Sequence, residues 1–258
     1  MIPKVIHYCW LSDDPFPEEI KRCIDSWKKY MPEYTIKRWS KDNFDINSVP
    51  LVKEAYEAKK YAFAADYIRC YALYTEGGIY LDSDVLAFKS FEKLLHEANY
   101  VTGLEYTPVP RLKKEQIDKN GHRKQNVESV FGIGIQAAFM ASIPGHPFCK
   151  TCLERYNKLT LSELLLAKLT APILQVKEME PYGFVYDNIK QELSNGIIIY
   201  PTTIIGQSRN EIYGRFLTHL GAGSWVRKTF KSKMIKRLNK YGIYKLYIQV
   251  KDILGLLK

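Results

Sequence analysis

The chain has 258 residues, of which 46% are hydrophobic and 26% charged, and it carries a formal net charge of +10. This length and composition are those of a globular domain with a substantial core, and they exclude a low-complexity or disordered chain. The charge lies at one end, because residues 226–258 contain ten Lys or Arg and one acid. The nearly neutral remainder argues against a basic nucleic-acid groove and for an anionic surface at the C-terminal end.

The cysteines and the apolar stretches bear on compartment and membrane contact. Five cysteines stand at spacings that fit no disulfide framework, and the chain starts without the charged and apolar regions of a signal peptide. No apolar run approaches the roughly 20 residues that a bilayer crossing requires. The sequence therefore predicts a reduced, cytoplasmic protein that lies on the surface of a membrane if it contacts one.

The N-terminal elements predict a βαβ unit. Residues 2–10 and 34–39 read as strands, and residues 17–30 carry apolar side chains at helical spacing behind acidic residues and prolines. Such a start is typical of a parallel sheet, which binds ligands at the carboxyl ends of its strands.

Two glycines separate the next predicted helix from the next predicted strand. Residues 53–75 form a long helical stretch that ends at Gly77 and Gly78, and the apolar run IYL follows directly. The sequence DSD then places Asp82 and Asp84 at the carboxyl end of this strand, where a parallel sheet has its ligand site.

The later part of the chain contains one long polar segment among further helices and strands. Residues 106–127 form that segment, and a loop of this length inside a compact domain is usually functional or mobile. Around it the sequence predicts helices near 91–98 and 146–159, strands at 100–105, 129–142 and 197–206, and a turn-rich segment at 218–225.

The C-terminal residues 226–258 combine apolar stripes at helical spacing with lysines between them. This pattern is typical of basic amphipathic helices that lie on anionic lipid. A helix docked on its own domain shows the same stripe, and both interpretations stay open. We therefore expect one domain over residues 1–225 and a separate helical tail.

Asp82 and Asp84 are the first candidate chemical groups. Residues i and i+2 of a strand point to the same side, so both carboxylates can converge on one divalent ion. Hard oxygen ligands in an open, hydrated site suit Mn²⁺ or Mg²⁺. An Asp-x-Asp pair also arises often by chance, so a solvated strand end and a phosphoryl-transfer nucleophile with its acid are alternatives.

Asp66 and Arg69 form a second candidate pair in the preceding helix. They lie three residues apart, on one face of a helix that is otherwise rich in alanine and aromatic residues. Burying such a pair is costly. It is either an internal salt bridge or a pair that binds sugar hydroxyls.

Several segments, taken together, resemble one enzyme family. In order and spacing they are similar to the capsular-polysaccharide glycosyltransferases with an Asp-x-Asp motif, glycosyltransferase family 32, which are related to outer-chain mannosyltransferases and to the large glucosylating toxins. The resemblance covers roughly residues 1–225. The matching segments are IPKVIHYCW, SW at 26–27, YTIKRW, AADYIRCYAL, GGIYLDSDV, GHPF and HLGAGSW.

The resemblance implies an α/β fold of the GT-A (Rossmann-like) type over residues 1–225, a nucleotide-sugar donor and a divalent metal, Mn²⁺ or Mg²⁺. It also implies roles for individual residues. Trp10 stacks on the nucleotide base, Asp66 and Arg69 hold the donor sugar, Asp82 contacts ribose or sugar, and Asp84 binds the metal.

Later segments supply the remaining residues that the resemblance implies. His219, Ser224 and Trp225 close over the diphosphate, and His219 is a candidate second metal ligand. Gln136 is the amide nearest to the position where relatives carry an asparagine that faces the donor sugar. The segment 106–127 matches no family pattern, and we interpret it as a mobile lid over the acceptor.

From these features we expect a metal-dependent hexosyltransferase that retains the anomeric configuration. It would transfer a sugar from a nucleotide sugar, by expectation a UDP-sugar, to a lipid-linked oligosaccharide in bacterial capsular or other surface polysaccharide synthesis. The basic tail would hold it on the anionic inner face of the plasma membrane, and nucleic acid is not an expected partner. An Asp-x-Asp phosphohydrolase and a non-enzymatic lipid-docking adaptor are the alternatives.

Overall fold

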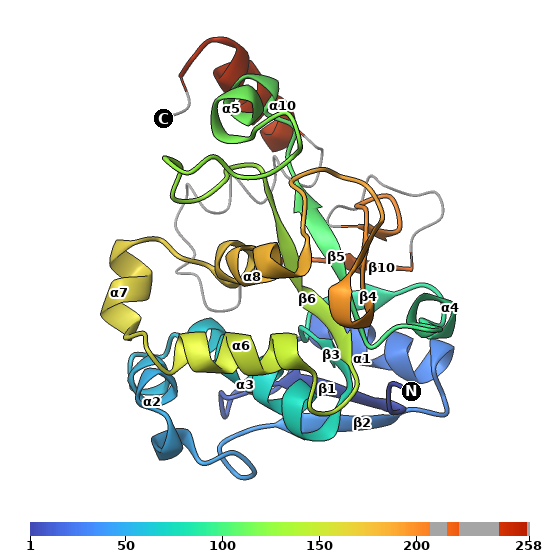
Figure 1. Ribbon diagram of the computed structural model, residues 1–258. Coiled ribbons are helices and arrows are strands. Elements are labelled where there is room, and N and C mark those ends of the chain that lie inside the picture. The colour runs from blue at the N-terminus through green and yellow to red at the C-terminus, as the bar shows by residue number, and fades with distance from the viewer. Residues whose placement is uncertain (207–215, 222–242, 257–258) are drawn as a thin grey trace.

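The computed structural model describes residues 1–206, 216–221 and 243–256 of the chain. Within these residues a seven-stranded sheet has helices on both faces (Figure 1), so the α/β class that the sequence predicts is confirmed. The strand order is β2-β1-β3-β6-β5-β8-β7. The strands are β1 (Val5–Cys9), β2 (Thr35–Trp39), β3 (Gly78–Leu81), β5 (Tyr100–Tyr106), β6 (Ile133–Ser142), β7 (Gln191–Leu193) and β8 (Ile197–Tyr200).

The strand directions divide this sheet into parallel and antiparallel parts. β1 runs parallel to β2 and β3, as expected for a βαβ start, and β5 runs parallel to β8. β6 runs antiparallel to both β3 and β5, and β7 runs antiparallel to β8. The prediction of a parallel sheet is therefore correct for β1, β2 and β3 and for the pair β5–β8, while β6 and β7 make the sheet mixed.

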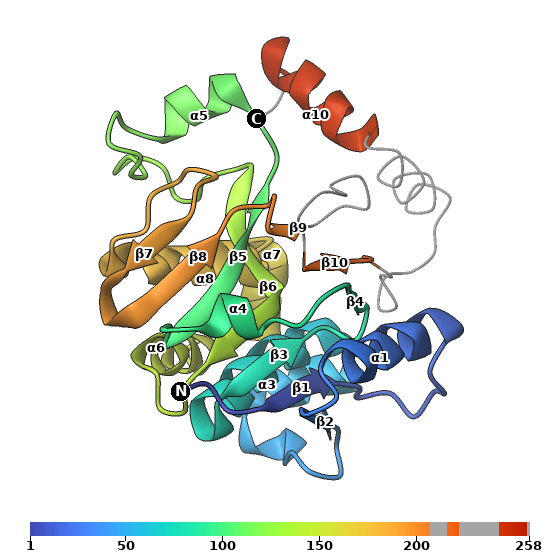
Figure 2. The ribbon, with the colours of Figure 1, turned by 90° about the vertical axis from the view of Figure 1, so that its right-hand side faces the viewer.

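A small second sheet joins the middle of the chain to its later part (Figure 2). Its order is β4-β10-β9, and β10 pairs antiparallel with β4. Helix α1 (Glu18–Tyr30) also binds β4, because Trp27 Nε1 donates to the Val85 carbonyl at 2.8 Å and the Ala87 amide donates to Ser26 Oγ at 3.0 Å. The strands are β4 (Val85–Ala87), β9 (Ile205–Gly206) and β10 (Leu217–His219).

Two apolar clusters form the core, one on each face of the central sheet. The helix α1 covers one cluster, with Cys23 and Trp27 fully buried, and α3, α6 and α8 cover the other. The remaining helices are α2 (Pro50–Glu57), α3 (Tyr61–Glu76), α4 (Glu92–Leu95), α6 (Pro147–Tyr156), α7 (Leu161–Leu166) and α8 (Ala171–Met179), with 3-10 turns at Ile46–Ser48, Glu180–Tyr182 and Ser194–Gly196.

The helical stretch predicted over residues 53–75 is two helices. α2 ends at Glu57 and α3 begins at Tyr61, because Lys59 between them has φ of 53°. This left-handed conformation cannot continue a right-handed helix. The prediction of one continuous helix is wrong at this point.

One segment contains more structure than the sequence predicts, and the described part of the tail contains a helix. The polar segment 106–127 contains the helix α5 (Pro110–Gln116) and a β-bridge between Ile117 and Arg123. The tail contains the helix α10 (Ile243–Ile253), while its residues 226–242 lie outside the described part of the chain. An ordered helix in the polar segment corrects the expectation of a plain loop.

Gly77 and Gly78 make the turn from α3 into β3. Their φ values are 67° and 95°, a region that side chains disfavour. A Cβ atom on Gly78 would lie 2.4 Å from Cγ1 of Val5, which is on the adjacent strand β1. The predicted helix end at Gly77 is confirmed, and the glycine pair lets β3 pack directly against β1.

Candidate active site

The two carboxylates of the DSD sequence lie on a tight turn. β3 is fully buried and ends at Leu81, and the Val85 amide then donates to the Asp82 carbonyl at 2.9 Å. The expectation that Asp82 and Asp84 extend from one face of a strand is therefore wrong in detail. The turn nevertheless brings them together at the carboxyl end of β3, with Asp84 buried and Asp82 partly exposed.

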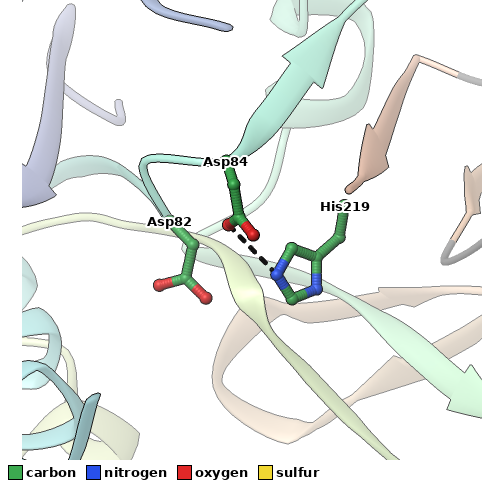
Figure 3. Close-up of side chains that lie close together, drawn as sticks. All are labelled: Asp82, Asp84 and His219. Atoms are coloured by element: carbon green, nitrogen blue, oxygen red, sulfur yellow. Dashed lines mark ion pairs between the residues drawn. The ribbon is translucent and has the colours of Figure 1, made fainter. Parts of the chain in front are cut away.

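His219 reaches the same place from the far end of the chain. In the small sheet His219 is the register partner of Val85, and the Leu220 amide donates to the Asp84 carbonyl at 3.0 Å. His219 Nε2 lies 3.1 Å from Asp84 Oδ1, and Asp82 stands beside this pair (Figure 3). Backbone pairing thus positions the histidine that the resemblance selects.

These three side chains could hold a divalent cation. One ligand atom from each of Asp82, Asp84 and His219 lies within 4.8 Å of the others, a spacing that a shared ion can bridge. Carboxylate oxygens with one imidazole suit Mn²⁺, and carboxylates with water suit Mg²⁺. The donor set therefore fits the metal that the resemblance implies.

The electrostatics of this group favour a positive charge. Burial lowers the pKa of His219, but the Asp84 carboxylate, helped by Asp82, outweighs burial and raises the pKa to about 9. The imidazole without a metal is therefore protonated near neutral pH and pairs with Asp84. A cation at this position would replace that proton.

Arg69 connects α3 to the Asp-x-Asp turn. Its guanidinium is buried, with one nitrogen 2.9 Å from Asp66 Oδ1 and 3.2 Å from Asp82 Oδ1. Its other terminal nitrogen donates to the Ala137 carbonyl at 2.6 Å, and the group lies over the Tyr80 ring at 5.0 Å. Asp66 and Arg69 form an internal salt bridge, and both residues also line a cavity. The geometry is therefore compatible with a structural salt bridge and with a pair that binds sugar hydroxyls.

The cavity between these groups is large enough for a sugar and part of a diphosphate. It measures about 460 Å³. Charged side chains form one wall, and the aromatic rings of Tyr61 and Phe63 with Pro172 contribute an apolar wall from α3 and α8. The charged lining residues are Asp14, Asp66, Arg69, Asp82, Asp84, Glu105 and His219.

Trp10 lies just past β1 at the mouth of this cavity. Its Nε1 donates to the Asp14 carbonyl at 2.9 Å, and its ring meets Phe16 edge-on at 4.9 Å between centroids. A second hollow of about 270 Å³ shares Trp10 and extends to Arg38 and Lys41. The Trp10 side chain is half-buried and lines both hollows. Its ring can therefore be reached by a ligand that stacks on it.

The sequence-predicted residues divide into three groups. Trp10, Asp66, Arg69, Asp82, Asp84 and His219 line one cavity. Gln136 is fully buried on β6 and is not among the lining residues, so the structure does not bring it to the others. Ser224 and Trp225 lie outside the described residues.

Glu105, Tyr61 and Phe63 line the cavity although the sequence did not point to them. The aromatic pair could have been found from its position at the start of the helix that carries Asp66 and Arg69. Glu105 carries no such signal, because only the pairing of β5 with β6 brings the end of β5 beside the site.

Comparison with known proteins matches part of the chain to a family. Residues 17–101, which include the Asp66–Arg69 pair and the Asp82–Asp84 pair, match the family described as "Glycosyltransferase sugar-binding region containing DXD motif". Over these residues the chain is similar to the DXD glycosyltransferases. The GT-A fold that the resemblance implies agrees with this match and with the α/β sheet.

Individual relatives match parts of the chain. It is 33% identical over 108 residues to "Inositol phosphoceramide mannosyltransferase 3" of Schizosaccharomyces pombe, across 39% of this chain and 29% of the relative. It is 24% identical over 208 residues to "Inositol phosphoceramide mannosyltransferase 2" of the same organism, across 78% of this chain and 50% of the relative. The chain thus spans half or less of the length of these two relatives.

Among solved structures, the chain is similar to "PaToxG Glycosyltransferase". The TM-score is 0.49 and the sequence identity is 20%, and the match covers 70% of this chain and 69% of that chain.

Proposed function

We propose that the protein is a metal-dependent glycosyltransferase that transfers a sugar from a nucleotide sugar to a lipid-linked glycan. The observation that carries this proposal is the convergence of Asp82, Asp84 and His219 beside the Asp66–Arg69 pair in one cavity of about 460 Å³. A nucleotide sugar needs these two features side by side, a cation for its diphosphate and polar groups for its sugar. The family match favours this function over the phosphohydrolase and the lipid-docking adaptor.

The residues have the following proposed roles. A divalent ion held by Asp84 and His219, with Asp82 beside it, would neutralise the charge that grows on the diphosphate as the glycosidic bond breaks. Arg69 fixes the Asp66 and Asp82 carboxylates, and Asp66 accepts hydrogen bonds from sugar hydroxyls. We assign no nucleophile and expect retention, with the acceptor hydroxyl attacking on the face that the leaving group vacates.

The donor and acceptor are proposals at a finer level. We propose a UDP-sugar, with Trp10 stacking on the base and Ser224 and Trp225 closing over the diphosphate. The names of the two relatives add mannose as a candidate sugar and an inositol-containing lipid as a candidate acceptor class. They support an acceptor attached to a lipid, and a bacterial capsular or other surface glycan is the acceptor we propose.

The proposed location is the cytoplasmic face of the plasma membrane. Among residues 1–206, 216–221 and 243–256, no helix combines the length and the apolarity that a bilayer crossing requires. The basic tail over residues 226–258 would provide peripheral contact with anionic lipid, and the segment 106–127 would cover the acceptor.

A thermal-shift screen of UDP- and GDP-sugars, with and without Mn²⁺, tests the proposed function. A ligand that binds only the folded state raises the free energy of unfolding, by about 2.7 kcal/mol when its concentration is a hundred times Kd. The melting temperature rises with it. We expect a metal-dependent shift with one nucleotide family, and its loss in Asp84→Asn. Asp25→Asn is the matched control, because Asp25 is an exposed residue of α1 that pairs with Lys28.

Two results would contradict the proposal. One is the absence of a metal-dependent shift with every nucleotide sugar. The other is an Asp84→Asn protein that responds like the wild type. Hydrolysis of an aryl phosphate that depends on Asp82 would favour the phosphohydrolase instead.

A further inference from the structure

The helix α10 lies beside α5 at the end of the molecule away from β1 and β2 (Figures 1 and 2). The side chain of Ile248 on α10 packs with Val109 and Leu112 into a small apolar cluster of its own. Ile248 is 8% exposed. This contact places the C-terminal helix on the segment 106–127.

A buried carboxylate strengthens the contact between these helices. Asp252 is fully buried, and its two carboxylate oxygens accept hydrogen bonds from the amides of Arg111 at 2.9 Å and Leu112 at 3.1 Å. Arg111 Nε also donates to the Asp252 carbonyl at 2.9 Å. Since no side chain of α5 caps its own first turn, Asp252 supplies that cap from about 140 residues away.

The inward position of Asp252 turns the apolar stripe of α10 outward. An amphipathic helix on a water-soluble domain normally buries its aliphatic side chains and exposes its charged ones. Here a carboxylate is buried, and three aliphatic side chains of α10 and one in the turn directly after it are exposed. Their exposed fractions are 59% for Leu246, 46% for Val250, 74% for Ile253 and 64% for Leu254.

The charge of the tail indicates which kind of partner would cover these exposed aliphatic side chains. Residues 226–258 contain ten Lys or Arg and one acid, and that acid is the buried Asp252. A second copy of the chain would bring the same positive charge to the interface, and like charges oppose association. An anionic lipid surface instead attracts the lysines and accepts the aliphatic side chains.

We infer that the outward face formed by Leu246, Val250 and Ile253 of α10, with Leu254 directly after the helix, docks on an anionic lipid bilayer, and that Asp252 transmits this attachment to α5. The inference rests on the proposed function, because an acceptor that is attached to a lipid has to enter the cavity from a membrane surface. α5 follows β5, whose Glu105 lines the cavity. A bilayer bound by α10 therefore lies next to the segment that we propose to cover the acceptor.

Co-sedimentation with vesicles tests the docking surface without using transferase activity. The full chain is mixed with phosphatidylcholine vesicles that contain or lack phosphatidylglycerol. We expect binding to the anionic vesicles, and a roughly tenfold or greater loss of affinity in the double variant Ile253→Glu/Leu254→Glu, because two aliphatic contacts become charges. Both residues are exposed, so the variant should fold normally.

The matched control is Leu166→Glu on α7. Leu166 is 84% exposed and lies outside α10, so this variant adds a charge at an exposed leucine that is not part of the proposed docking face. It should bind vesicles like the wild type. The inference is overturned if the α10 variant binds as well as the wild type, if Leu166→Glu is the variant that loses binding, or if light scattering shows that the stripe joins two copies of the chain.

Amide hydrogen exchange tests the link through Asp252. We expect anionic vesicles to slow exchange in residues 110–116 of the wild type, and Asp252→Ala to remove this slowing while the protein still sediments with vesicles. Unchanged exchange in the wild type on vesicle addition would overturn the link, and this arm needs no variant. The nucleotide-sugar thermal shift, measured without vesicles, tests the proposed function independently. Failure of the docking inference can therefore be distinguished from failure of the proposed function.

Discussion

The carboxyl group of Asp66 is subject to opposing influences. Burial raises its pKa to about 7 although the guanidinium of Arg69 favours the charged form, and the nearby Asp82 carboxylate adds to the rise. The unfolded group keeps a pKa near 3.8. Asp66 is therefore close to half ionised near neutral pH, which is unusual for a residue that we propose to hold a sugar.

Stability should fall as pH rises through the interval set by Asp66. Between about pH 4 and 7 the folded protein keeps a proton that the unfolded chain has released, so the free energy of unfolding decreases with rising pH. The decrease should be on the order of 2–4 kcal/mol and should be absent from Asp66→Asn. Denaturant unfolding of both proteins near pH 5 and near pH 8 measures it; parallel pH dependences would contradict the assigned pKa.

At the scale of single elements, the junction of α3 and β3 positions the acidic groups. Arg69 and Asp66 lie on α3, Asp82 follows β3, and only Gly77 lies between α3 and Gly78, the first residue of β3. Gly78 has φ of 95°, and a Cβ atom there would overlap Val5 on β1. The path of the chain into β3 therefore requires a residue without a side chain at position 78.

Gly78→Ala should destabilise the protein by about 2–5 kcal/mol, the combined cost of a left-handed alanine and of overpacking against Val5. Gly145→Ala is the control. Gly145 also has a positive φ, of 72°, but a Cβ atom there meets nothing within 4 Å. That variant should lose only about 1 kcal/mol. Denaturant unfolding measures both, and equal losses would show that the contact with Val5 is unimportant.

Local patterns allowed most elements and part of the site to be predicted. The strand at 34–39 and the helix at 17–30 match β2 and α1 to within a residue, because each has a clear periodicity. The Asp82–Asp84 pair and the Asp66–Arg69 ion pair could be found because each spans three or four positions. The break at Lys59 could not, since lysine has no special preference for φ above zero.

Contacts between distant segments account for what the sequence did not predict. The direction of β6 and the place of Glu105 depend on how strands pair, and neither leaves a local pattern. His219 was selected by resemblance alone, and its pairing with β4 gives the physical reason. The helix in the polar segment 106–127 receives its N-terminal cap from Asp252, far along the chain.

At the scale of the whole molecule, charge and apolar surface gather at the C-terminal end. Residues 226–258 hold nine of the ten net positive charges, and α10 exposes its aliphatic side chains in the same part of the chain. Charge and apolar surface would contribute differently to membrane binding as the salt concentration changes. Screening weakens the charge attraction and leaves the apolar contacts largely unaffected.

Binding to anionic vesicles should therefore weaken as ionic strength rises. The Debye length falls from about 30 Å at 0.01 M to about 3 Å at 1 M salt, so the attraction of the lysines is largely lost. We expect a residual, salt-insensitive binding that disappears in Ile253→Glu/Leu254→Glu. Titration with sodium chloride measures this dependence, and binding that does not change with salt would show that the tail's charge plays no part.

The pairing of β4 with β10 also governs when the cation site can exist during synthesis. Asp84 and His219 are 135 positions apart, although their strands are neighbours in one sheet. At translation rates of about 5–20 residues per second, roughly 7–27 s pass between the synthesis of the two residues. A nascent chain thus has its carboxylates long before its histidine, and it can acquire a three-ligand site only when nearly all of the catalytic domain has left the ribosome.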